Sequence, residues 1–112
     1  MPESTERGAL TEAVFYILLS LLNPLHGYGI MQKVAMLSNN RVKLGSGTLY
    51  GAINTLLEKG WICQSTEVST GRKKAYVITA TGKDILKDEI RRLEELIKNG
   101  KALLKGGVEY ES

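Results

Sequence analysis

Between residues 61 and 79 the sequence changes from helical to strand periodicity, and this change restricts the fold more than any other feature. Residues 61–68 and 75–79 are rich in β-branched and aromatic residues, and a turn-forming segment, residues 69–73, connects them. This pattern predicts a β-hairpin whose tip is basic. The chain is therefore expected to combine helices with one small β element.

Three segments before the hairpin carry apolar residues at helical spacing. The first extends from about residue 10 to 22 and ends at Asn23-Pro24. The second ends near residue 37. The third starts at Ser46 to Thr48, which are both good N-cap residues, and Gly60 provides its C-terminal stop.

A fourth helix is predicted after the hairpin, starting at about Thr81. Its apolar residues keep the alternating spacing of a coiled-coil seam; they are Leu86, Ile90, Leu93, Ile97 and Leu104. Asn99-Gly100 is expected to weaken this helix, and Gly106-Gly107 to end it. Such a seam requires a partner surface.

The order helix, helix, helix, hairpin, helix predicts a mainly α fold with a small β-hairpin. This is the order of a winged helix-turn-helix plus a C-terminal dimerisation helix. We expect residues 8–80 to form the DNA-binding domain, residues 81–105 the dimerisation helix, and residues 106–112 a flexible tail. One domain with an appended helix also suits a chain of 112 residues.

The excess positive charge lies in the middle of the chain. The formal net charge is +3, and residues 41–80 contain six Lys or Arg but only two acidic residues. This distribution favours contact with a polyanion in that region. Chance clustering of solvated cations would give the same count, so the charge alone does not decide the function.

The outward face of the third helix is small, polar and nearly uncharged. A helix that enters the major groove needs small residues for close approach, and donors or acceptors such as Asn54 to meet base edges. Gly47 and Gly51 each weaken a helix by up to about 1 kcal/mol relative to Ala, which suggests that something approaches closely there. An ordinary solvated face would carry more Lys and Glu. The predicted DNA contacts are Tyr28, Lys43, Ser46, Gly47, Thr48, Tyr50, Gly51 and Asn54, with Arg72, Lys73 and Lys74 of the hairpin.

Several motifs resemble the PadR family of transcriptional regulators and occur in the family's order. They are residues 25–30 (LHGYGI), 47–50 (GTLY), 56–62 (LLEKGWI) and 71–79 (GRKKAYVIT), followed by Gly82. The resemblance covers roughly residues 9 to 98. It implies a cytoplasmic homodimer that usually represses transcription, with its recognition helix in the major groove and its wing on the DNA backbone or minor groove.

The resemblance also implies that the last helix packs with the first helix of the partner subunit. The first helix has a second apolar stripe that suits this contact, and the expected interface residues are Phe15, Leu19, Leu22, Leu86, Ile90, Leu93 and Ile97. The family's small subgroup can bind flat hydrophobic compounds at the dimer centre. A small hydrophobic or aromatic effector is therefore placed near Phe15, Leu93 and Ile97. No tryptophan follows Trp61, so the tryptophan stacking of some members is not expected.

Enzymatic, metal-binding and membrane functions are not predicted. The chain has one histidine, His26, and one cysteine, Cys63, and no acid that would orient them is evident. A zinc site needs about four N or S ligands, or three and a water. The longest apolar stretch, residues 14–22, is far shorter than the roughly 20 residues that span a bilayer. We expect no catalytic residue, cofactor, metal or leader peptide.

One alternative remains open at this point. A winged helix can also serve as a protein-interaction module without specific DNA binding. The basic middle of the chain would then be incidental, and the second stripe of the first helix would dock another protein. Salt-dependent binding to duplex DNA distinguishes the two functions.

Overall fold

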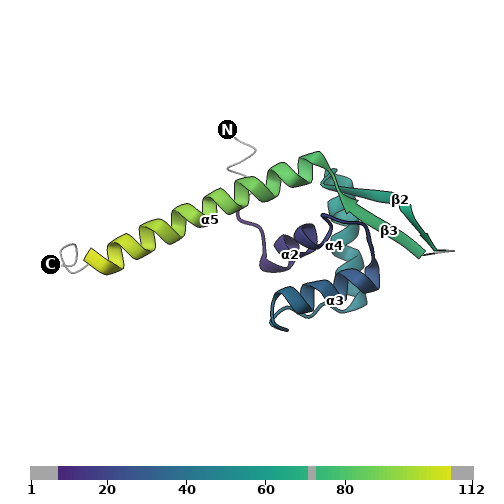
Figure 1. Ribbon diagram of the computed structural model, residues 1–112, viewed down its shortest axis with the longest axis horizontal. Coiled ribbons are helices and arrows are strands. Elements are labelled where there is room, and N and C mark those ends of the chain that lie inside the picture. The colour runs from purple at the N-terminus through teal and green to yellow at the C-terminus, as the bar shows by residue number, and fades with distance from the viewer. Residues whose placement is uncertain (1–7, 71–72, 107–112) are drawn as a thin grey trace.

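The computed structural model describes residues 8–70 and 73–106, and its elements follow the predicted order (Figure 1). The elements in this part of the chain are α2 (Glu12–Ser20), β1 (Leu25–His26), α3 (Gly27–Leu37), α4 (Ser46–Lys59), β2 (Ile62–Thr70), β3 (Lys73–Ile78) and α5 (Ala80–Gly106). Arg72 at the predicted hairpin tip and residues 107–112 of the predicted tail lie outside the described residues.

The first three helices and the sheet enclose one hydrophobic core. Three residues on the predicted inner face of the first helical segment, Ile17, Leu18 and Leu21, are fully buried. The Leu21 carbonyl also accepts a hydrogen bond from the Ile78 N–H at 2.8 Å, which ties the end of α2 to β3. The other core residues are Ile30, Val34, Leu49, Ile53, Leu56, Ile62, Tyr76, Ile78 and Leu86.

Local signals set the ends of α2 and α4. The Thr11 hydroxyl accepts a hydrogen bond from the Val14 N–H at 3.1 Å and so caps α2. Gly60 ends α4 in the left-handed conformation, with a φ of 75°. The N-cap of α4 is Gly45, which has the extended backbone of a cap. The prediction that Ser46 or Thr48 would cap this helix is therefore wrong, because Ser46 is already helical.

The sheet has a third strand that the sequence did not predict. The strand order is β1-β3-β2, and all pairings are antiparallel. Strand β1 pairs Leu25 with Tyr76 and His26 with Ala75. A strand of two residues has no periodicity to detect, and its pairing depends on residues about 50 positions away. Strand β1 places the start of α3 directly beside the wing.

Helix α5 starts at Ala80, one residue before the predicted Thr81. The Thr79 hydroxyl accepts a hydrogen bond from the Gly82 N–H at 3.1 Å and donates one to the Gly60 carbonyl at 2.6 Å. Thr79 thus joins the C-terminal end of α4 to the start of α5. Gly82 lies against the Trp61 backbone, where a Cβ atom would collide with the carbonyl oxygen.

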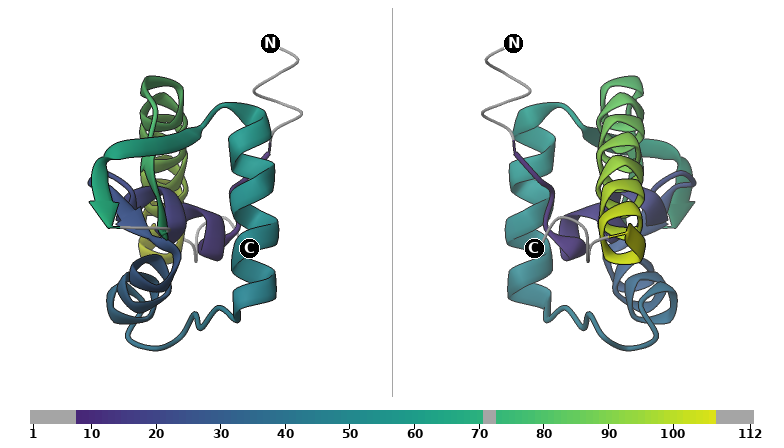
Figure 2. Two further views of the ribbon diagram at one scale, coloured as in Figure 1. Left: turned by 90° about the vertical axis from the view of Figure 1, so that its right-hand side faces the viewer. Right: turned by 90° about the vertical axis from the view of Figure 1, so that its left-hand side faces the viewer.

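The last helix projects from the domain as one continuous element of 27 residues (Figure 1). Viewed along α5, helix α2 lies between α5 and α4 (Figure 2). The helix continues through Asn99-Gly100, so the weakening predicted there is not observed. One glycine costs about 1 kcal/mol in a helix, and good helix formers flank it on both sides.

This arrangement is a winged helix, as predicted: α3 and α4 form the helix-turn-helix, and β2 and β3 form the wing. The fold is mainly helical with one small sheet. Within the described ranges, none of the helices combines the length and apolar character needed to cross a membrane.

Candidate nucleic-acid interface

Helix α4 presents a small, uncharged face to solvent. Its inner side is held by Leu49, Ile53 and Leu56, which are fully or almost fully buried. A Cβ atom added to Gly47 or Gly51 would meet nothing within 4 Å. The fold therefore does not require glycine at these two positions, and their smallness leaves room for an external partner. The predicted contact residues of this helix, all exposed, are Ser46, Gly47, Thr48, Tyr50, Gly51 and Asn54.

Positive charge flanks this face instead of covering it. Lys43 is exposed on the segment just before α4, and Lys73 and Lys74 are exposed at the start of β3. Arg72, the remaining predicted cation, lies outside the described residues. A polyanion that crosses the face of α4 would thus meet cations at its edges, where they can contact phosphates.

A second feature beside α4 is a hollow of about 510 Å³ that we call the tyrosine hollow. It lies where the start of α3, helix α4 and strand β3 meet. The structure brings together four predicted DNA contacts here, from three separate elements. The lining residues are His26, Gly27, Tyr28, Gly29, Tyr50, Lys73, Lys74 and Tyr76.

Two long-range contacts build the tyrosine hollow. Strand β1 pairs with β3 and sets the first turn of α3 beside Tyr76. Gly27 at the start of α3 lies against the Tyr50 hydroxyl, and any side chain at residue 27 would collide with that ring. Tyr28 points outward, with 67% of its surface exposed. The motif glycine therefore leaves room for the Tyr50 ring in its present position beside the start of α3.

Lys73, Lys74 and the start of α3 favour an anion in the tyrosine hollow, and Tyr76 supplies it with a neutral donor. Burial raises the pKa of the Tyr76 hydroxyl above its usual value, and the neighbouring Tyr50 raises it further. Tyr76 therefore remains a neutral hydrogen-bond donor near pH 7. The first turn of α3 contains no acidic residue, and the His26 side chain does not cap it. Helix N-termini with free N–H groups attract phosphate and carboxylate.

The sequence analysis missed four residues of the tyrosine hollow: His26, Gly27, Gly29 and Tyr76. The motif around residue 27 was visible, but its contact with Tyr50 was not. Tyr76 reads as an ordinary core residue of a strand, because nothing in the local pattern shows which side of the ring meets solvent. Of the other predicted contacts, those that the structure describes, including Lys43 and Asn54, do not line the hollow.

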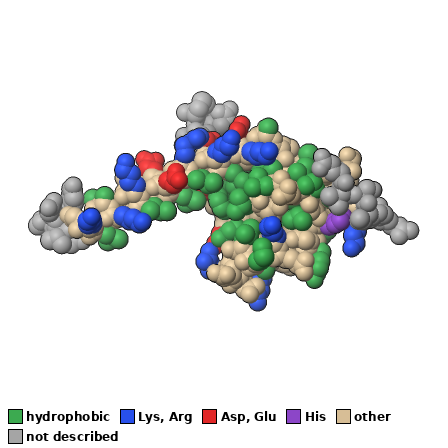
Figure 3. All heavy atoms as spheres, in the orientation of Figure 1, with side chains coloured by type: hydrophobic (Ala, Val, Ile, Leu, Met, Phe, Trp, Pro, Cys, Tyr) green, Lys and Arg blue, Asp and Glu red, His purple; other side chains and the backbone are tan. Residues whose placement is uncertain are grey.

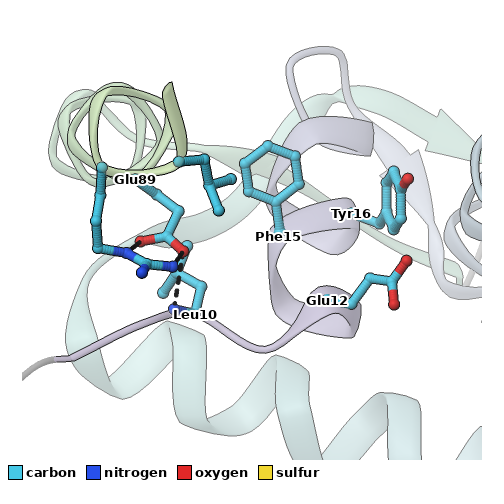
Figure 4. Close-up of a pocket in the computed structure, with 7 residues that line it drawn as sticks. Leu10, Glu12, Phe15, Tyr16 and Glu89 are labelled. Atoms are coloured by element: carbon cyan, nitrogen blue, oxygen red, sulfur yellow. Dashed lines mark hydrogen bonds and ion pairs between the residues drawn. The ribbon is translucent and has the colours of Figure 1, made fainter. Parts of the chain in front are cut away.

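A smaller hollow of about 280 Å³ lies between α2 and α5, and we call it the α2–α5 hollow (Figure 4). Phe15 projects from α2 toward α5, and Leu93 of α5 also lines the space. These are two of the three residues predicted for an effector. The third, Ile97, does not line it and is 54% exposed farther along α5.

The α2–α5 hollow also has a polar wall that the sequence analysis missed. Glu89 is buried, with 2% of its surface exposed. Its carboxylate accepts hydrogen bonds from the Arg92 guanidinium at 2.6 and 3.0 Å and from the Leu10 N–H at 3.2 Å. The hydrogen bond to Glu89 raises the pKa of Arg92 further above its usual value. The pair thus ties the segment before α2 to α5.

The predicted dimer residues have different surroundings within one chain. Leu86 belongs to the core of its own subunit, and Phe15, Leu19 and Leu93 are half-buried. Beyond Leu93, α5 carries apolar side chains that residues 8–70 and 73–106 leave exposed (Figure 3). The exposed apolar residues of α5 and of the segment after α2 are Leu22, Ile90, Leu96, Ile97, Leu103 and Leu104. Leu96 and Leu103 were not predicted as interface residues.

Metal chemistry finds no support in the described part of the chain. No group of three or more His, Cys, Asp or Glu residues is arranged there to hold an ion. Cys63 is a free, exposed thiol.

Comparison with known proteins agrees with this geometry. The model of the transcriptional regulator PadR-like family matches residues 16–88. A PadR family transcription regulator from Clostridium difficile R20291 has a similar structure, with a TM-score of 0.63 and 27% identity; the match covers 81% of this chain and 97% of that one.

Two further proteins are more distant or much longer. The structure of Bacillus subtilis PadR in complex with operator DNA matches with a TM-score of 0.57 and 22% identity, over 70% of this chain and 45% of that one. A 37.1 kDa protein of a Streptomyces fradiae transposon is 33% identical over 86 residues. That match covers 76% of this chain but only 24% of the transposon protein.

Proposed function

The chain belongs to the PadR-like family of transcriptional regulators, and from this premise we propose that it is a homodimeric repressor that binds a specific double-stranded DNA site. The observation that carries this proposal is the exposed face of α4. Gly47 and Gly51 leave it free for close approach although neither glycine is needed for packing. Asn54 offers a donor and an acceptor for an adenine edge, and a good bidentate pair of this kind contributes about 1–3 kcal/mol of discrimination.

Phosphate contacts would come from the residues around α4. Lys43, Lys73 and Lys74 lie at its edges, and each cation that meets a phosphate adds about one unit to the slope of log affinity against log salt. The structurally similar Bacillus subtilis protein was solved in complex with operator DNA. Cytoplasmic action follows from this function, because chromosomal DNA is the proposed partner.

The proposed dimer uses α5, with residues 8–80 as the DNA-binding domain and residues 81–105 as the dimerisation helix. The last part of α5 exposes four apolar side chains. Leu96, Ile97 and Leu103 are about half exposed, and Leu104 is 86% exposed. A continuous apolar stripe on a projecting helix is a typical association surface. A second copy would cover it with its own α5 and with the exposed side of α2.

An effector site between the subunits is part of the same proposal. Phe15 and Leu93 offer an apolar surface, and Arg92 offers a cation at the rim of the α2–α5 hollow. A small hydrophobic or aromatic compound there would alter how α5 meets α2. Recognition helices of a dimer read half-sites roughly 34–36 Å apart, so a small rotation at the centre would misplace both. Titration of planar aromatic compounds into wild type and Phe15→Ala, followed by operator affinity, tests this site.

The experiment that tests the main proposal is footprinting on the DNA upstream of the protein's own gene, followed by affinity measurement over a range of salt. We expect protection of a two-fold symmetric site and a steep salt dependence. Lys73→Ala should make the slope shallower by about one unit on both operator and random DNA. Asn54→Ala should reduce only the preference for the operator. If wild type, Lys73→Ala and Asn54→Ala bind DNA with equal affinity that does not depend on salt, the chain is a protein-interaction module instead.

A further inference from the structure

We propose that the tyrosine hollow binds a single phosphodiester of one DNA strand, with the Tyr76 hydroxyl as a hydrogen-bond donor to it. This inference rests on the proposed function, because the DNA supplies the phosphodiester. It assigns a binding role to a residue of the wing that the sequence analysis did not predict as a DNA contact.

Tyr76 is the first observation that points to a ligand. The residue is 94% buried by its surroundings, since only 6% of its surface is exposed, and it lines the hollow. Among the residues that the structure describes, none forms a hydrogen bond with its hydroxyl. Polar groups of buried residues are almost always hydrogen-bonded in native proteins, to protein, ligand or water, so this hydroxyl is available to a partner in the hollow. An acceptor that enters the hollow would satisfy this donor.

The start of α3 is the second observation. This helix of 11 residues begins at the hollow, and its first-turn residues Gly27, Tyr28 and Gly29 line it. The first N–H groups of a helix have no intrahelical partner and carry a partial positive charge. Neither an acidic side chain in the first turn nor a cap from the side chain of His26 satisfies them. These donors and Tyr76 reach the hollow from different elements.

The charge of the lining selects an anion over a neutral acceptor. Lys73 and Lys74 come from β3, and no Asp or Glu is among the lining residues. The Tyr76 hydroxyl stays protonated, because burial and the neighbouring Tyr50 raise its pKa. Two cations, neutral phenol donors and helix N–H groups match the charge and the several acceptor oxygens of a phosphate.

The position of the hollow favours a backbone phosphate of DNA over a free ion. Tyr50 belongs both to the hollow and to the outward face of α4, so the two sites are contiguous. A duplex whose major groove received α4 would bring a strand past this edge. The volume of about 510 Å³ exceeds what one phosphate group fills, and leaves room for the sugars on either side. Inorganic phosphate has the same chemistry, so the test must separate the two sources.

The test combines Tyr76→Phe with operator duplexes in which single phosphates are replaced by neutral methylphosphonates. In wild type we expect one position per half-site where this replacement lowers affinity about tenfold, as for loss of a charge-assisted hydrogen bond. Tyr76→Phe should lower affinity for the unmodified operator by a similar factor. At that one position the two changes should be much less than additive, because both remove the same contact.

The matched control is Tyr16→Phe, which removes a phenol that lines the α2–α5 hollow instead. It should leave operator affinity and the methylphosphonate profile unchanged. Equal melting temperatures of wild type and Tyr76→Phe would show that a loss of affinity is not a loss of fold. Because the hydroxyl is neutral, the salt slope should stay the same in Tyr76→Phe, unlike in Lys74→Ala.

Failure of this inference can be distinguished from failure of the proposed function. If wild type binds the operator tightly but Tyr76→Phe binds it equally well, the phosphodiester site is wrong and DNA binding stands. If wild type shows no salt-dependent binding to any duplex, the proposed function itself is wrong. Amide shifts of Tyr28 and Gly29 in a titration with inorganic phosphate, without any binding to DNA, would assign the hollow to a free anion and overturn the phosphodiester.

Discussion

The hydroxyl of Tyr50 lies directly against Gly27, so that the middle of the interface depends on the absence of one side chain. This contact leaves the Tyr50 ring beside the start of α3. It also holds the Tyr50 ring at the edge shared by the tyrosine hollow and the outward face of α4. The shape of the proposed DNA site at this edge therefore depends on glycine at residue 27.

Gly27→Ala should weaken operator binding more than it weakens the fold. Its methyl group would displace the Tyr50 ring, which is 45% exposed and can swing outward. We expect a destabilisation of about 1 kcal/mol, at the low end for overpacking, together with a clear loss of affinity. Tyr50→Phe with Gly27→Ala should restore part of the stability, because the clashing oxygen is gone. Thermal unfolding and operator titration of the three variants provide the measurements. Unchanged affinity in Gly27→Ala would contradict this role for Tyr50.

Gly51→Ala should raise stability and lower DNA affinity at the same time. A methyl group there meets nothing within 4 Å, so the helix gains up to about 1 kcal/mol from the better propensity of alanine. The same methyl group would occupy the space into which a base edge must come. Gly45→Ala, just before the helix and equally free of contacts, is the control for a general effect of substitution. A stabilised Gly51→Ala protein with full operator affinity would show that this face does not approach DNA closely.

Gly82→Ala and Gly100→Ala should have opposite effects although both glycines lie in α5. At Gly82 the added Cβ atom collides with the Trp61 carbonyl and with Ile78, and backbone cannot easily move aside. We expect a loss of roughly 2–3 kcal/mol, as for overpacking. At Gly100 nothing lies within 4 Å, and alanine should stabilise the helix by up to about 1 kcal/mol. Chemical denaturation gives the change in the free energy of unfolding for each variant. A Gly82→Ala protein as stable as wild type would contradict the close packing of Gly82 against Trp61.

Replacing Leu96 and Ile97 with Asp should convert a dimer into a monomer without unfolding the domain. Both side chains are more than half exposed in one chain, so charge there costs little until a partner must cover it. Lys98→Asp alters charge on the same turn without touching the apolar stripe and serves as the control. Sedimentation analysis gives the oligomeric state. Wild type that stays monomeric at high concentration would exclude the proposed dimer.

Arg92→Ala should lower the melting temperature more than Arg91→Ala. Arg92 pairs with Glu89, which is buried and would lose its cation, whereas Arg91 pairs with the exposed Asp88. A buried charge without its partner is costly, but surface ion pairs contribute little. Glu89→Gln together with Arg92→Ala should recover part of the loss, since the buried negative charge is then removed as well. Equal melting temperatures for the two single variants would mean that Glu89 keeps enough other partners.

Local patterns in the sequence were sufficient to predict the winged helix and the outward face of α4. Gly60 and the hairpin are short-range signals, since each depends on residues within a few positions. The inner face of α4 follows from helical periodicity, so its outer face could be predicted as well. The resemblance of residues 25–30, 47–50 and 56–62 to one family pointed to the same family of transcriptional regulators that the comparisons show.

The tertiary structure alone decided which distant residues share a site. The two residues of β1 have no pattern of their own, yet their pairing with β3 brings Tyr76 to the start of α3. Leu86 fits the coiled-coil spacing but packs in the core of its own chain. Glu89 looks like any helix-surface acid until Leu10 and Arg92 enclose it. Periodicity tells which side of an element is apolar, whereas the partner of that side depends on contacts between elements far apart in the chain.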